Sequence, residues 1–216
     1  MPGQRPRPTW ILHFTHLDNL AAIVDHGLSS DTSVQSSGHL VVEAGNMGIK
    51  SRRRNRVVDL SPGGTVADYT PFYFAPRSPM LFSLHKGNVP TFCEDTRDLI
   101  YLATTTEALA EQELTLIVSD RNAVLDYATM AYEPDCDDLV DWDLMNVRYW
   151  ADTAEDPDRR ERRMAECLVW EPVEFTNFSV IVVHGKTQYD VVTSLLRKLG
   201  VSDADCSVQI NRDWYF

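Results

Sequence analysis

The segment from Asp158 to Trp170 constrains the fold most, because a charged run passes directly into a short apolar run with one carboxylate at the junction. Residues 159–164 contain good helix formers and predict a helix or turn. Residues 167–170 predict the start of a buried strand. Glu166 would then lie at the edge of a sheet, within reach of the preceding guanidinium groups. Such a carboxylate is a candidate for chemistry at an electron-poor carbon, and the alternative is a surface glutamate that balances the arginines.

Length and composition indicate one domain with an ordinary hydrophobic core. The chain has 216 residues, of which 44% are hydrophobic, and this is enough for one well-packed domain. Its formal net charge is −12, from 20 basic and 32 acidic residues. This charge argues against a protein that coats nucleic acid over its whole surface, although it leaves room for a local basic cleft.

The cysteines and the N-terminal residues indicate the compartment. Four cysteines are widely spaced and form no CxxC pair, so we expect reduced thiols in an intracellular protein rather than a disulfide framework or a zinc site. Residues 1–8 contain no apolar segment typical of a signal peptide. No apolar run approaches the ~18 residues that span a membrane. These features predict a cytoplasmic protein with no membrane partner.

Short strands and helices are predicted along the chain without an internal repeat or a linker. The predicted strands are residues 10–14, 68–74, 99–102, 114–118, 167–170, 178–183 and 207–210, and the predicted helices are residues 15–27, 79–87, 107–111 and 191–200. Residues 1–8 predict a flexible tail, and residues 29–39 predict a Ser-rich loop. Residues 119–157 are acidic, aromatic and irregular, as functional connections often are. We therefore expect an α+β fold with a single domain over residues 9–216.

Few local motifs point to a ligand. His13 and His16 have HxxH spacing, but their side chains would diverge at a strand end and no third ligand is evident, so we expect no metal site. Glycine-rich nucleotide-binding motifs and serine or cysteine nucleophile motifs are not found. Residues 50–56 carry five cations within seven residues. This run is either a solvated helix face or a phosphate-binding surface, since guanidinium forks match phosphate oxygens.

The order of these features is compatible with a transferase that uses NAD. A strand ends near a histidine, an arginine cluster and an aromatic strand follow, and Glu166 comes late, after a long connection. Breaking the bond between nicotinamide and ribose requires orientation and one negative charge near the developing cation. Glu166 could supply that charge.

Several sequence blocks, in a fixed order, carry a resemblance to one family. They are Leu12–His16 with Asn19–Leu20, Arg53–Arg56, Gly63–Gly64, Asp68–Leu81, Tyr149–Trp150, Ala165–Val169 and Asp213–Tyr215. With these blocks the chain resembles the DarT family, which comprises the DNA ADP-ribosyltransferase toxins of bacterial toxin–antitoxin systems. The resemblance covers nearly the whole chain. It implies an ADP-ribosyltransferase-like fold, with a central mixed β-sheet flanked by helices.

The resemblance also implies an activity and an NAD site. ADP-ribose would be transferred from NAD, the co-substrate, to a base in single-stranded DNA, and in the branch of the family that this chain most resembles the base is thymidine. Glu166 would be the catalytic glutamate. The implied NAD-binding residues are His13, Phe14, Thr15, Ala22, Ser30 and Arg54. Ala22 departs from the glycine that relatives often carry there.

Arginine and aromatic residues are implied at the acceptor side. Arg54 would be the second catalytic residue, and we expect it to stabilise a deprotonated thymine, since a guanidinium with a pKa above ~12 is a poor proton acceptor. The implied DNA-binding residues are Arg53, Arg56, Arg148, Tyr149 and Trp150. The two aromatic residues could stack on unpaired bases or simply pack in the core.

The implied partners are single-stranded DNA, NAD and a macrodomain antitoxin of the DarG type, and we expect a monomer. Two other functions stay open at this point. One is an ADP-ribosyltransferase that acts on RNA or protein, which would share the NAD half of the site. The other is a non-catalytic module that binds NAD or nucleic acid.

Overall fold

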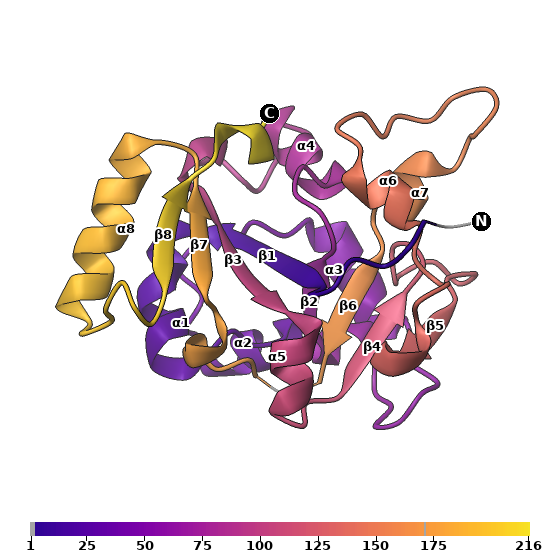
Figure 1. The fold of residues 1–216 in the computed structure, drawn as a ribbon, viewed down its shortest axis with the longest axis horizontal. Helices are drawn as coiled ribbons and strands as arrows, with labels where there is room; N and C mark the ends of the chain where they lie inside the picture. The colour runs from indigo at the N-terminus through magenta and orange to yellow at the C-terminus, as the bar shows by residue number, and fades with distance from the viewer. Residues whose placement is uncertain (1–2, 171) are drawn as a thin grey trace.

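The computed structural model describes residues 3–170 and 172–216, which form one eight-stranded sheet with helices around it (Figure 1). The strands are β1 (Trp10–His16), β2 (Thr70–Tyr73), β3 (Leu99–Thr105), β4 (Leu116–Ser119), β5 (Met130–Tyr132), β6 (Glu166–Val169), β7 (Val180–Val183) and β8 (Ser207–Ile210). Their order is β5-β4-β6-β2-β1-β3-β7-β8. The β7–β8 pair is parallel and the other pairs are antiparallel. The expected α+β fold with a central mixed sheet is confirmed.

The helices surround this sheet. They are α1 (Leu20–His26), α2 (Asp31–Ser37), α3 (Met47–Asn55), α4 (Pro79–His85), α5 (Thr106–Glu111), α6 (Trp142–Asn146), α7 (Arg159–Arg162) and α8 (Lys186–Lys198). In Figure 1, α8 lies at one end of the molecule, whereas α6 and α7 lie at the other end, near the N-terminus. None of the described helices combines the length and apolar composition needed to cross a membrane.

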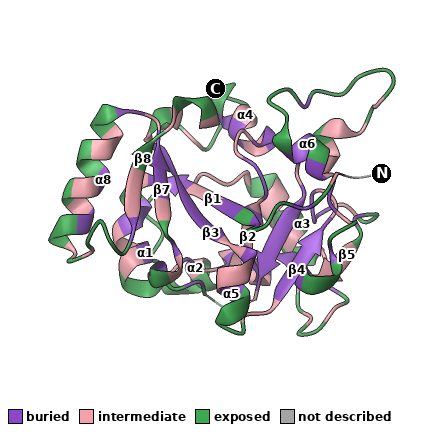
Figure 2. Ribbon diagram, viewed as in Figure 1, coloured by how far each residue is buried: buried purple, intermediate pink, exposed green. Residues whose placement is uncertain are grey.

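Alternation along the central strands explains why both faces of the sheet are covered. Successive side chains of a strand point to opposite faces. Ile11 accordingly packs in the larger core cluster with residues of α1, α6 and α8, whereas its neighbour Leu12 packs in a second cluster with residues of α4. Strand β3 is buried at its first six residues. Figure 2 shows the buried strands at the centre and exposed surface on the outer helices.

Three segments differ from what the sequence predicts. The Ser-rich loop over residues 29–39 contains α2, and the irregular connection over residues 119–157 contains β5 and α6. The third segment is the tail over residues 1–8, where Arg5 is buried and its guanidinium pairs with the Glu133 carboxylate and donates to Thr106 Oγ1 at 2.8 Å. The prediction of a flexible tail is therefore wrong at Arg5, because a buried cation with these partners fixes the chain around it. Residues 1–2 lie outside the described residues.

Candidate active site

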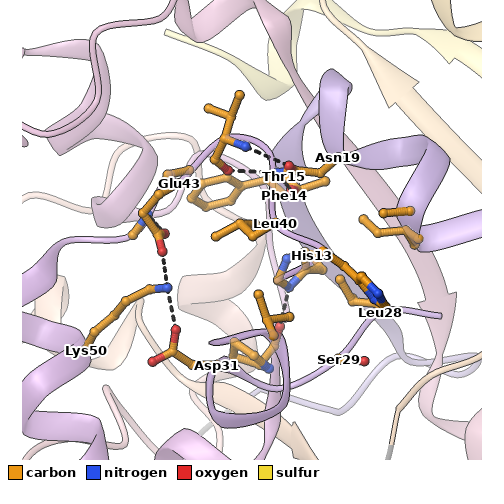
Figure 3. A pocket seen from close by; sticks show the side chains of 18 of the residues that line it. His13, Phe14, Thr15, Asn19, Leu28, Ser29, Asp31, Leu40, Glu43 and Lys50 are labelled. Carbon is orange, nitrogen blue, oxygen red and sulfur yellow. Dashed lines mark hydrogen bonds and ion pairs between the residues drawn. The ribbon is translucent and has the colours of Figure 1, made fainter. Parts of the chain in front are cut away.

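A cleft opens where β1 and β2 separate. These strands are paired at one position, Leu12 opposite Tyr73, whereas β1 pairs with β3 along its whole length. Pro71 in β2 has no N–H to give to a β-ladder. The resulting cleft has a volume of about 230 Å³, and β1, α1, α2, α3 and the loop over residues 38–46 line it. Figure 3 shows His13, Phe14 and Thr15 of β1 along this cleft, facing Asp31 and Lys50.

His13 bridges the two separating strands. Its Nδ1 lies 2.8 Å from the carbonyl oxygen of Pro71, and because a carbonyl only accepts, Nδ1 carries the proton. Burial lowers the pKa of His13 to about 4, and the nearby Arg53 charge adds to this effect. The imidazole is therefore neutral at pH 7, and Nε2 is left as a hydrogen-bond acceptor for a ligand.

Glu166 lies in the middle of the sheet rather than at its surface. It is the first residue of β6, directly opposite Tyr73 of β2 and Ser119 of β4, and it is 1% exposed. Arg53 Nη1 donates to Glu166 Oε2 at 2.7 Å, and the Ala123 N–H donates to Oε1 at 3.3 Å. The interpretation of Glu166 as a surface residue is therefore wrong. Its buried charge is compensated by Arg53 from α3.

The arginines of residues 159–163, just before Glu166 in the sequence, do not contact its carboxylate. Arg162 pairs with the acidic residues Asp141, Asp156 and Asp158. Arg163 is 3% exposed and donates to the carbonyl oxygens of Leu144, Met145 and Pro76 at 2.6–2.8 Å. These arginines hold the connection that leads into β6, and burial lowers the pKa of Arg163 to about 10.

Tyr73 adds a neutral hydroxyl beside the carboxylate. Burial raises the pKa of Tyr73 strongly, and the charge of Glu166 raises it further. The phenol therefore stays protonated and can donate a hydrogen bond. Its ring stacks on Phe14 with centroids 6.2 Å apart, so both rings form an aromatic wall of the cleft.

The structure separates two adjacent arginines of α3 by their partners. The sequence analysis expected Arg54 to be the second catalytic residue, and its guanidinium pairs with Asp31 at 3.1 Å, with its side chain 38% exposed. Arg53 lines the cleft and contacts Glu166. Arg53 and Arg54 are adjacent on α3, where one residue rotates a side chain by ~100° about the helix axis. Arg53 is therefore the arginine of this run that reaches the carboxylate.

Most of the residues expected to bind NAD do line the cleft. Phe14, Thr15 and Ala22 are among them, together with His13. Ser30 is not, because its side chain accepts from the Ser33 N–H and caps α2. This capping position explains why Ser30 is buried.

Asn19 is a residue of the cleft to which the sequence analysis gave no role. It is 3% exposed, its Nδ2 donates to Thr15 Oγ1 at 2.9 Å, and its Oδ1 accepts from the N–H groups of Val41 and Val42 at 2.9 Å. Asn19 therefore fastens the loop over residues 38–46 to the end of β1. A polar residue directly before the first apolar residue of a helix is a weak signal, so the sequence alone did not reveal the role of Asn19.

The residues expected to bind DNA have different environments. Tyr149 is 78% exposed, whereas Trp150 is 9% exposed, donates to the Arg77 carbonyl oxygen at 2.8 Å and packs edge-on against Phe82. Trp150 therefore belongs to the core, and its expected role as a stacking surface is wrong. Arg148 forms an exposed ion pair with Asp213 at 3.0 Å.

Arg56 is half-buried. Its Nη2 donates to the Asp126 carbonyl oxygen at 3.4 Å. Within the described part of the chain, no group of three or more His, Cys, Asp or Glu side chains is arranged to hold a metal ion.

Comparison with known proteins agrees with this geometry. A family model described as ssDNA thymidine ADP-ribosyltransferase, DarT, matches residues 12–216. The chain belongs to the DarT family. The expected DarT-type enzyme is thereby confirmed as an NAD-dependent DNA mono-ADP-ribosyltransferase that acts on thymidine in single-stranded DNA. This specificity argues against RNA or protein as the acceptor and against a non-catalytic module.

Individual members of the DarT family show how far the similarity extends. A DNA ADP-ribosyl transferase from Mycobacterium tuberculosis is 33% identical over 202 residues, which cover 91% of this chain and 86% of that protein. The structure of Thermus sp. 2.9 DarT in complex with ADP-ribosylated ssDNA has a TM-score of 0.90 at 29% identity, with both chains covered completely. The same Thermus protein in complex with NAD⁺ has a TM-score of 0.82, with 98% of this chain and 99% of that chain covered.

One more relative combines two activities in a single chain. It is a DNA ADP-ribosyl transferase–DNA ADP-ribosyl glycohydrolase fusion protein from Thermosipho africanus, 24% identical over 196 residues. These residues cover 90% of this chain and 46% of the fusion protein. The present chain therefore corresponds to a part of the fusion protein.

Proposed function

We propose that Glu166 and Arg53 are the catalytic pair and that NAD occupies the cleft beside them. The observation that carries this proposal is the buried contact of 2.7 Å between the two side chains, at the point where β2 and β6 meet α3. When the bond between nicotinamide and ribose breaks, its electron pair leaves with nicotinamide and positive charge develops on the ribose. A carboxylate placed there stabilises the transition state more than it stabilises NAD itself.

Arg53 acts on the acceptor base in this proposal. In a thymidine of DNA the sugar occupies N1, so the ring nitrogen that can be modified is N3. N3 gives its proton to water ahead of bonding to the ribose carbon, so negative charge is shared by N3 and the adjacent carbonyl oxygens until the new N–C bond forms and neutralises it. Arg53 Nη1 is committed to Glu166, but Nη2 is buried and has no partner within the described residues. This N–H group would donate to a thymine carbonyl oxygen and stabilise the developing charge.

Tyr149, together with Arg56 and Arg148, would guide the DNA strand toward this pair. The exposed ring of Tyr149 offers a stacking surface for an unpaired base, and Arg56 and Arg148 offer positive charge to phosphates. Since the net charge of the chain is −12, a single flexible strand would avoid the acidic surface more easily than a rigid duplex.

The cellular role proposed for the chain is that of a toxin opposed by a macrodomain antitoxin of the DarG type. The Thermosipho africanus fusion protein supports this, because its name joins the transferase to a DNA ADP-ribosyl glycohydrolase. An enzyme that removes ADP-ribose from DNA would reverse the modification. We further propose that the chain acts as a monomer in the cytoplasm, where NAD and DNA are both present.

The decisive experiment compares Glu166→Gln with the parent protein. Both are incubated with NAD and with single strands that contain or lack thymidine, and the products are examined for a mass increase of one ADP-ribosyl group. We expect modification of thymidine strands by the parent and a loss of at least ~100-fold in the variant. Glu111→Gln is the matched control, because Glu111 is an exposed carboxylate at the end of α5. Turnover by Glu166→Gln within a few-fold of the parent would contradict the catalytic role.

A further inference from the structure

The cleft that would receive NAD contains few permanent charges. Among the described residues that line it, these are Asp31, Glu43, Lys50 and Arg53. The diphosphate of NAD carries two negative charges and needs at least one cation close by. Arg53 donates Nη1 to the Glu166 carboxylate, and its Nη2 is the group proposed above to bind the acceptor base. Lys50 is therefore the remaining cation of the cleft that could meet the diphosphate.

The Lys50 ammonium already forms ion pairs with two carboxylates. Its ammonium pairs with Asp31, the first residue of α2, and with Glu43 of the loop over residues 38–46, as Figure 3 shows. Lys50 precedes Arg53 by three residues on α3, so both side chains leave the same side of the helix. A phosphate at Lys50 would consequently lie within one helical turn of the catalytic pair.

The two carboxylates differ in how firmly they are held. Asp31 also pairs with Arg54 at 3.1 Å and accepts a hydrogen bond from Gln35 at 3.0 Å, and its side chain is 11% exposed. Besides Lys50, Glu43 accepts the Gly45 N–H of its own loop, and its side chain is 32% exposed. Water can therefore solvate Glu43 at lower cost than Asp31 when an anion competes for Lys50.

We propose that Lys50 binds the diphosphate of NAD and that Glu43 holds this ammonium in the NAD-free protein. Binding of NAD then exchanges the Glu43 carboxylate for phosphate oxygen, because one ammonium cannot neutralise two carboxylates and a diphosphate. The exchange releases one attachment of the loop over residues 38–46, while the loop keeps its hydrogen bonds to Asn19. This inference rests on the proposed function, in which NAD occupies this cleft.

Variants of Lys50 and Glu43 test the exchange because they should change the KM for NAD in opposite directions. The KM for NAD and the kcat are measured with a saturating thymidine strand for the parent, Lys50→Ala and Glu43→Gln. Lys50→Ala should raise the KM by about 10- to 100-fold, the range for a lost charge-assisted hydrogen bond. Glu43→Gln should lower the KM by about two- to fivefold, since it removes a partly exposed competitor. The kcat should change far less than the KM in both variants.

Inhibition by ADP and by adenosine separates diphosphate binding from a structural role. Lys50→Ala should weaken inhibition by ADP and leave inhibition by adenosine unchanged. A higher or unchanged KM in Glu43→Gln would overturn the exchange, even if Lys50→Ala proved too unstable to assay. If the parent protein does not modify thymidine strands at all, the proposed function fails. If the parent transfers ADP-ribose and the KM of neither variant changes, this inference alone fails.

Discussion

Replacing Arg53 with alanine should both destabilise the protein and abolish most of its transferase activity, whereas Arg54→Ala should do neither. Glu166 is 1% exposed in the parent protein, and without the Arg53 side chain its carboxylate keeps the Ala123 N–H at 3.3 Å as its hydrogen-bond donor among the described residues. Removing one member of a buried ion pair typically costs about 3–5 kcal/mol of stability, because the other charge stays buried without compensation. Both Arg53 and Glu166 have side chains at most 11% exposed, so this range applies.

Arg54 provides a control in the same helix with the same chemistry. Its side chain is 38% exposed, and its partner Asp31 keeps the Lys50 ammonium after the substitution. An exposed ion pair of this kind contributes about 0–1 kcal/mol. The two alanine variants should therefore differ in free energy of unfolding by about 3 kcal/mol.

Urea unfolding and transfer to a thymidine strand, measured on the same samples, test this reasoning. We expect Arg53→Ala to lose about 10²–10³-fold in transfer, as when one electrostatic donor to a transition state is removed. Adding Glu166→Gln to Arg53→Ala should recover most of the lost stability and none of the activity, because the uncompensated charge is gone. If Arg54→Ala loses as much transfer as Arg53→Ala, the assignment of Arg53 is refuted.

Four further variants test other parts of the structure. Folding lowers the pKa of His13 to about 4, so between pH 6.5 and 4 the unfolded state binds a proton at His13 that the native state does not. The free energy of unfolding should therefore fall as the pH falls through this window, by at most about 3 kcal/mol. His13→Gln should remove this pH dependence in unfolding experiments, and an unchanged slope of stability against pH would contradict the assignment. Tyr149→Ala should change stability by less than about 0.5 kcal/mol and raise the KM for the DNA strand about tenfold, whereas Trp150→Ala should cost about 3–5 kcal/mol in thermal unfolding; equal stability of both variants would refute their different environments. Arg163→Met should lower stability by about 3 kcal/mol or more, since three carbonyl oxygens lose a donor, and a variant as stable as the parent would contradict that role.

The sequence by itself determined most of the strands and several residues of the cleft. Short apolar segments predicted most of the strands, because burial and alternation follow directly from residue type. The junction at Glu166 was visible because a carboxylate stands directly before the apolar residues 167–170. Phe14, Thr15 and Ala22 were expected at the NAD site through the family resemblance, and the structure places all three along the cleft.

The tertiary structure decided which side chains meet. The helix α3 has no buried residue, so no apolar stripe in the sequence sets its rotation about its axis. Contacts with Asp31 and Glu166, which are distant in the sequence, set that rotation and thereby select Arg53 over Arg54. Trp150 is a similar case, since an aromatic residue suits a core as well as a DNA-binding surface. Local sequence specifies the type of each side chain, whereas its partner depends on segments that only folding brings together.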